Sequence, residues 1–144
     1  MTAPDESTKT PYSIAVTVDR PFDQVLGDTR DALAAQGFGV LTEIDMQATL
    51  KAKIGADIAP QVIFGACRPP LADAALRVEP SIGLLLPCNV VVRRVDGDRT
   101  RVETIDPAIM VSVTGNPGLQ AVATEARTRL TDALRSLEPA PPAT

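Results

Sequence analysis

The fold is decided by residues 82–104, IGLLLPCNVVVRRVDGDRTRVET. The apolar first half of this stretch predicts a strand. Pro87 has no N–H to donate to a neighbouring strand, so we expect a sheet edge or a bulge there. Asp96 and Gly97 form a dipeptide typical of a tight hairpin turn, after which residues 99–104 return as the antiparallel partner. The stretch therefore predicts an antiparallel sheet.

The rest of the chain supplies further strands and helices. Alternating or continuous apolar residues predict a first strand, a half-buried second strand, a central third strand and a short last strand, at residues 14–18, 38–46, 62–67 and 109–113. Apolar stripes at helical spacing predict helices over residues 21–36, 47–54, 69–79 and 117–137. The predicted class is α+β, with helices packed on one face of an antiparallel sheet and a long C-terminal helix.

The length and the two ends predict one folded unit. A chain of 144 residues has the usual size of a single domain. Residues 1–10 and 138–144 are rich in Pro, Thr and Ala without periodicity, so we expect frayed tails on either side of a single domain, residues 11–137.

The charge and composition exclude several classes of function. The formal net charge is −4 and the sequence contains no His, so a nucleic-acid partner is not expected and the commonest metal ligand is missing. There is no leader pattern and no run of 18 uncharged apolar residues, so we expect a cytoplasmic protein without a membrane partner. Cys67 and Cys88 are the only cysteines, and we expect free thiols.

Three stretches resemble the bacterial and archaeal family called domain of unknown function 302, namely residues 37–55, 62–76 and 79–93. The segments GAC (65–67) and LLLPCNVVV (84–92) carry the most specific part of this resemblance. The resemblance covers about the whole folded region, and it implies a TBP-like α+β fold and a homodimer. It brings no established activity with it. Arg68 departs from the family, in which Asn more often follows the cysteine.

Cys67 has two interpretations. It lies just before Pro69 and Pro70, which begin a helix, and the positive end of a helix together with Arg68 would stabilise a reactive thiolate. The simpler interpretation is that Cys67 ends an apolar strand and is buried as a small hydrophobic residue. We favour the second.

Cys88 and Arg94 have the C-x5-R spacing of phosphatase loops, but the β-branched residues between them belong to a strand rather than to a phosphate-binding loop. We therefore reject that match. If Cys67 and Cys88 meet across the sheet, they could form a redox pair or bind a soft metal ion such as Cu(I), with Met46 or Met110. No recognised metal-binding spacing supports such a site, and none is assigned from the sequence.

Glu79, Lys51 and Lys53 could together line a polar pocket with aliphatic walls. The simpler interpretation, which we favour, is that the lysines lie on a solvated helix face and that Glu79 ends a helix.

The sequence lacks a complete catalytic constellation, so we favour a non-enzymatic, homodimeric binding module for a small ligand or metal. The cofactor, if any, is not indicated by the sequence. The candidate binding residues are Lys51, Cys67, Arg68, Glu79, Cys88 and Asn89. Two alternatives stay open: a thiol-based redox protein or enzyme with Cys67 as nucleophile, and a protein-interaction module that dimerises through the apolar face of residues 82–92.

Overall fold

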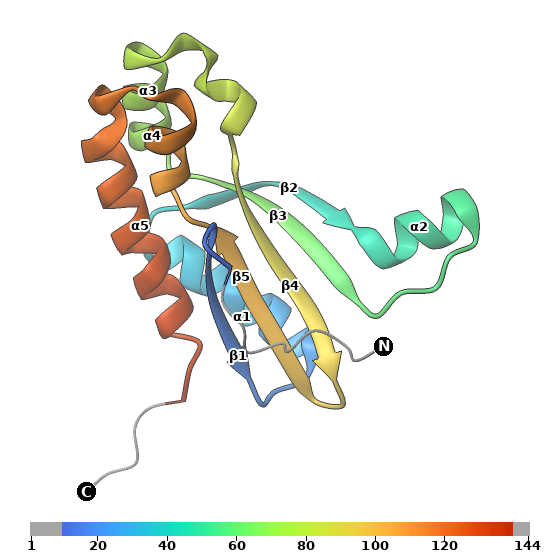
Figure 1. The fold of residues 1–144 in the computed structure, drawn as a ribbon. Coiled ribbons are helices and arrows are strands. Elements are labelled where there is room, and N and C mark those ends of the chain that lie inside the picture. The colour runs from blue at the N-terminus through green and yellow to red at the C-terminus, as the bar shows by residue number, and fades with distance from the viewer. Residues whose placement is uncertain (1–9, 140–144) are drawn as a thin grey trace, which may run out of the picture.

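The computed structural model describes residues 10–139, so the predicted tails, residues 1–10 and 138–144, lie almost entirely outside it. The described chain contains one antiparallel sheet with the strand order β1-β5-β4-β3-β2 (Figure 1). Its strands are β1 (Ser13–Val18), β2 (Gly39–Asp45), β3 (Gln61–Cys67), β4 (Cys88–Asp96) and β5 (Arg99–Ile105).

The helical elements alternate with these strands along the chain. They are α1 (Phe22–Ala35), α2 (Met46–Ile54), α3 (Pro69–Val78), η1 (Pro80–Leu85), α4 (Ala108–Thr114), η2 (Pro117–Leu119) and α5 (Gln120–Arg135), where η marks a 3₁₀-helix. The hairpin predicted at Asp96 and Gly97 is confirmed, because Asp96 pairs with Arg99 across the turn between β4 and β5. The predicted α+β class is confirmed as well. None of the helices within residues 10–139 combines the length and apolar character needed to cross a membrane.

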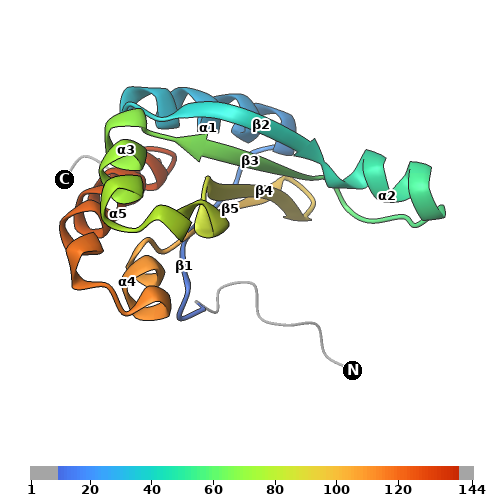
Figure 2. The ribbon, with the colours of Figure 1, turned by 90° about the horizontal axis from the view of Figure 1, so that it is seen from above.

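The main core lies between the sheet and helices α1 and α5, which cover the same face (Figure 2). Phe64 of β3 is fully buried there, and the guanidinium carbon of Arg30 in α1 lies 4.7 Å from the centre of its ring. Complete burial of one large apolar side chain contributes about 1.5–3 kcal/mol. This layer is therefore the main source of stability, and its members include Val16, Val18, Val25, Leu33, Val90, Val92, Val102, Leu130 and Leu134.

A second, smaller core lies beyond the end of the sheet. There the first half of α5 packs with α3, η1, α4 and η2 around Ile82, Met110 and Leu119. Asn116 joins these elements, because its side chain accepts a hydrogen bond from Gly118 N and donates to Val78 O at 3.0 Å. This second core holds η1 and α4 in place at one end of the sheet.

Two predicted strands are wrong in part or in whole. Residues 82–92 are not one strand: η1 ends at Leu85, the Leu86–Pro87 peptide bond is cis, and β4 begins at Cys88. Pro87 therefore precedes the ladder, where its missing N–H is tolerated.

The segment 109–113 belongs to helix α4 instead of the predicted short strand. Asp106 caps its start by accepting from Ala108 N at 2.9 Å, and Gly115 ends it with a φ of 68°. These caps, with the burial of Met110 in the second core, outweigh the strand preference of the β-branched residues.

Strand β2 exists as predicted, but it is not half-buried. It is an edge strand, and Leu41 and Ile44 are 65% and 45% exposed. Figures 1 and 2 show that β2 and β3 extend past the helical layer and that α2 projects from their far end. Helix α2 has no buried residue of its own. A register shift between Val40 and Thr42 interrupts the alternation, so Val40 faces the core beside Ala66, whereas Ile44 lies beside Ile63 on the other face of the sheet.

Candidate functional site

The face of the sheet opposite α1 and α5 contains a cavity of about 580 Å³, which we call the open-face pocket. Its floor is formed by alternate residues of the central hairpin, because side chains two residues apart point to the same face of a strand. These floor residues are Asn89, Val91 and Arg93 of β4 with Glu103 and Ile105 of β5. The volume falls within the range of about 300–1,000 Å³ typical of small-molecule sites.

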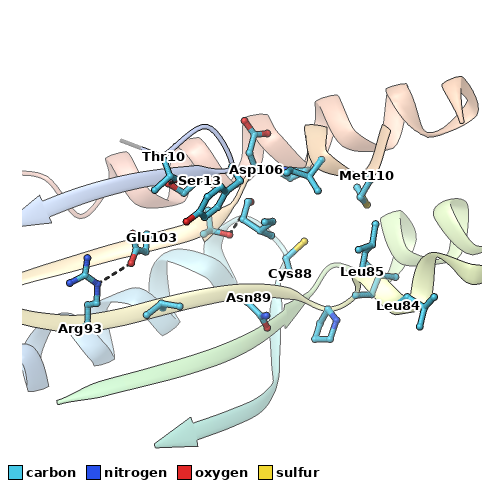
Figure 3. A pocket seen from close by; sticks show the side chains of 18 residues that line it. Thr10, Ser13, Leu84, Leu85, Cys88, Asn89, Arg93, Glu103, Asp106 and Met110 are labelled. Atoms are coloured by element: carbon cyan, nitrogen blue, oxygen red, sulfur yellow. Dashed lines mark hydrogen bonds and ion pairs between the residues drawn. The ribbon is translucent and has the colours of Figure 1, made fainter. Parts of the chain in front are cut away.

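The open-face pocket has a polar end and an apolar end (Figure 3). Arg93, Glu103 and Ser13 lie toward one end, whereas Leu85 and Met110 lie toward the other. The apolar wall comes from η1 and α4, which the second core positions beside the sheet. A molecule that fills this pocket would therefore meet hydrogen-bonding groups at one end and aliphatic side chains at the other.

The polar end is organised around the carboxylate of Glu103. Arg93 Nε donates to Glu103 Oε1 at 2.9 Å, and Arg101 Nε donates to Glu103 Oε2 at 3.2 Å. Arg101 also donates to Thr17 Oγ1 at 3.2 Å, and its side chain is only 5% exposed. Charge-assisted hydrogen bonds of this kind fix both partners in position. The polar end is thus an ordered group of charges.

Asp106 adds a second carboxylate to the lining of the open-face pocket. Its oxygens accept from Ala108 N at 2.9 Å and from Arg127 Nε at 3.2 Å. These contacts hold Asp106 at the start of α4, so its first role is to cap that helix.

A second and smaller cavity, of about 30 Å³, lies between the ends of β3 and β4 and helices α3, α4 and α5. Cys67, Arg68, Cys88 and Met110 are among its lining residues, and we call it the sulfur cavity. Burial and, as the smaller cause, the charge of Cys67 together raise the pKa of the Cys88 thiol from its ordinary value of 9.0 to about 11. Cys88 is therefore a protonated thiol at neutral pH.

Four of the predicted binding residues come together at this end of the sheet. Cys67, Arg68 and Cys88 line the sulfur cavity, and Asn89 lines the open-face pocket together with Cys88. Both cysteines are free, as expected. Cys88 and Arg94 both lie within strand β4, which agrees with the rejection of a phosphatase loop.

The structure does not bring the other two predicted residues to this place. Lys51 lies on α2 and pairs with Asp57 at 2.8 Å, with both side chains exposed. Glu79 follows α3 and accepts from Asn116 Nδ2 at 3.0 Å. Figures 1 and 2 place α2 and α3 at opposite ends of the molecule, so a polar pocket shared by Glu79 and the lysines is not formed.

Arg93 and Glu103 line the open-face pocket but are not among the residues predicted from the sequence. The turn at Asp96 and Gly97 alone would not have found them, because a hairpin continued without interruption from the Asp96–Arg99 pair puts Arg93 and Glu103 on opposite faces. A register shift between Arg94 and Asp96 places Val91 opposite Glu103 and puts Arg93 on the same face. Neither residue belongs to a local motif. Within residues 10–139 there is no group of three or more His, Cys, Asp and Glu side chains that could hold a metal ion.

These features define an α+β domain in which two helices cover one face of an antiparallel sheet and a pocket occupies the other. The chain belongs to the family described as "Domain of unknown function DUF302", whose model matches residues 14–137. It is similar to a solved structure described as "Crystal structure of uncharacterized conserved protein DUF302 from Bacillus stearothermophilus". The two are 25% identical with a TM-score of 0.80, over 88% of this chain and 98% of that chain. No curated protein matches the sequence.

Proposed function

We propose that this chain is a binding module for an amphipathic small molecule and that the open-face pocket is its site. The observation that supports this proposal is the division of a cavity of about 580 Å³ into a charged end and an aliphatic end. A sheet face with only a structural role would not need η1 and α4 to form the sides of a pocket above it. The matching ligand has an apolar body that lies against Leu85 and Met110 and a polar group that reaches Arg93 and Glu103.

The test uses anilinonaphthalene sulfonate, an amphipathic dye whose fluorescence rises in apolar sites. We compare the wild-type chain with Val91→Phe, which fills the floor of the pocket, and with Val113→Phe as a control. Val113 lies on α4 outside the pocket and is 64% exposed. Val91→Phe should weaken dye binding by about tenfold, or about 1.4 kcal/mol, and the control should not. Equal affinities in all three proteins would contradict the proposal.

The natural ligand is sought with the same variants. Protein purified under native conditions is denatured, and the released small molecules are identified by mass spectrometry. A compound that accompanies the wild-type chain and Val113→Phe, but not Val91→Phe, is the expected result.

We further propose that the domain is a homodimer whose interface is formed by β2 and α2. Isolated helices shorter than about 12–15 residues are marginal in water, and α2 has nine residues with none buried. An exposed apolar edge strand is a template for pairing with another chain. A second copy presents the same strand, so two β2 strands related by a two-fold axis would pair and cover Leu41 and Ile44.

Sedimentation analysis of two variants distinguishes dimerisation through β2 from dimerisation through the apolar segment at η1. Ile44→Lys places a charge on the β2 surface, and Leu84→Lys places one on η1, where Leu84 is 88% exposed. We expect dimers for the wild type and Leu84→Lys and monomers for Ile44→Lys. Monomers for Leu84→Lys alone would instead support dimerisation through the segment 82–92, and a monomeric wild type would contradict both.

A further inference from the structure

We propose that the molecule bound in the open-face pocket carries a hydroxyl as its polar group, which donates a hydrogen bond to Glu103 and accepts one from Ser13. This assignment rests on the open-face pocket being the ligand site, and it makes the ligand an amphipathic alcohol. Both side chains line the pocket, and Figure 3 shows them toward the same end of it.

The register of the sheet brings Ser13 and Glu103 together. Ser13 of β1 is opposite Ile105 of β5, and Ala15 is opposite Glu103. Opposite residues share a face of the sheet, and so do residues two apart on one strand, so Ser13 and Glu103 are diagonal neighbours on the pocket side. Diagonal neighbours are about 7–8 Å apart. The glutamate side chain covers part of that distance, which leaves a space suited to one oxygen atom in contact with both groups.

Glu103 can accept hydrogen bonds beyond those it makes within the chain. Its two oxygens accept from Arg93 Nε at 2.9 Å and from Arg101 Nε at 3.2 Å. A carboxylate has about four acceptor positions and no donor, so a molecule that binds it must supply the hydrogen. The two guanidinium groups already offset its negative charge, so an ammonium group gains little over a neutral O–H at this position.

Ser13 supplies the complementary donor. Its Oγ atom accepts from Thr10 Oγ1 at 2.6 Å, and the serine hydroxyl has one O–H of its own to donate. A ligand hydroxyl satisfies Ser13 and Glu103 with a single oxygen atom. An ether or a carboxylate accepts from Ser13 but has no hydrogen for Glu103.

The experiment compares four naphthalene probes that differ only in one substituent, which is hydroxymethyl, methoxymethyl, carboxylate or aminomethyl. Naphthalene fluorescence reports binding directly, because the chain has no Trp. We expect the wild-type chain to bind the alcohol about tenfold more tightly than the methyl ether, as for one hydrogen bond to a charged acceptor. The alcohol should also bind more tightly than the carboxylate and the amine.

Three variants test the two contacts. Glu103→Gln keeps the shape of the side chain without its charge, and it should reduce the alcohol-to-ether ratio of affinities to about threefold or less. Ser13→Ala leaves the ion pairs of Glu103 in place, and it should weaken the alcohol and the ether alike by about three- to tenfold. Ser112→Ala is the matched control, since Ser112 lies on α4 outside the pocket with its hydroxyl exposed, and it should change neither affinity. Each ratio compares two probes on one protein, so a loss of folded protein cancels.

The results that would overturn the hydroxyl also say whether the pocket stands. If the wild-type chain binds all four probes equally, or prefers the carboxylate or the amine, the pocket is a ligand site that does not recognise a hydroxyl. If no probe binds, the hydroxyl is excluded, and the dye experiment shows whether the pocket is excluded with it. An unchanged alcohol-to-ether ratio in Glu103→Gln, or unchanged affinities in Ser13→Ala, would refute the corresponding contact.

Discussion

Gly65 lies where strand β3 passes beneath Pro87, and replacing it by alanine tests the packing at this point. A Cβ atom on Gly65 would lie 2.3 Å from Thr42 Oγ1 and 2.8 Å from Pro87 Cγ. Both distances are below any normal carbon contact, so the neighbours must move. Thr42 belongs to β2, where its β-branched side chain has few rotamers, and Pro87 is a rigid ring between η1 and β4.

The magnitude follows from two opposing effects. Inserting a methyl group into a packed site costs about 1–3 kcal/mol. Alanine also restricts the unfolded chain relative to glycine, which offsets about 0.4–1 kcal/mol. We therefore expect Gly65→Ala to lower the free energy of unfolding by about 1–2 kcal/mol. Urea denaturation followed by far-ultraviolet circular dichroism measures this, because the chain has no Trp to report by fluorescence.

Two further variants decide whether the contact is the cause. Thr42→Ala removes the nearer atom, so it should restore about 0.5–1 kcal/mol when combined with Gly65→Ala. Gly27→Ala is the control: Gly27 lies in α1 with no atom within 4 Å of the added Cβ, and this change should stabilise the chain by about 0.5–1 kcal/mol. An unchanged urea midpoint for Gly65→Ala, or no coupling to Thr42→Ala, would refute the reasoning.

Three other predictions concern the cores and the buried thiol. Because the pKa of Cys88 is raised to about 11 in the folded chain, its thiol ionises at lower pH in the unfolded chain, and about 2–3 kcal/mol of stability present below pH 9 should be lost between about pH 9 and 11. In urea titrations Cys88→Ala should lack this part of the loss. A pH profile identical to that of the wild type would exclude Cys88 as the source. Asn116→Ala removes the cap of η2 and the bond to Val78 O, so thermal unfolding should report a loss of about 1–2 kcal/mol. Phe64→Ala should cost about 3–5 kcal/mol in the same assay, and a loss below about 1 kcal/mol would mean that the cavity had collapsed.

The parts of the fold that could be predicted from the sequence are those with local signals. The apolar stripe from Leu119 to Leu137 predicts α5, and Asp96 with Gly97 predicts the hairpin. Helix α4 could not be predicted in this way, because a run of β-branched residues favours a strand until its caps and its place in the second core are known. The exposure of β2 depends on the register shift between Val40 and Thr42, which turns Ile44 away from the core, and alternation alone does not contain that information.

The candidate site likewise contains residues that the sequence indicates and residues that it does not. Cys67, Cys88 and Asn89 stand out because polar and thiol groups interrupt unusually apolar segments, and they lie at the two cavities. Arg93 and Glu103 are ordinary strand residues in sequence, and their pairing follows from the register of β4 and β5. Lys51 was selected for its charge, but the chain places it on a helix remote from both cavities.

The strip from Leu86 to Cys88, together with Met110, lines both cavities. This strip therefore separates the open-face pocket from the sulfur cavity, and a movement of the strip that enlarges one cavity narrows the other. If a molecule bound in either cavity moves this strip, thermodynamic reciprocity requires that molecules bound in the two cavities change each other's affinity by the same factor. Interiors are close-packed, so even a displacement of one methyl group's width would be felt on the far side. Under that condition, a single proline-containing strip would couple the sheet face to the helix junction.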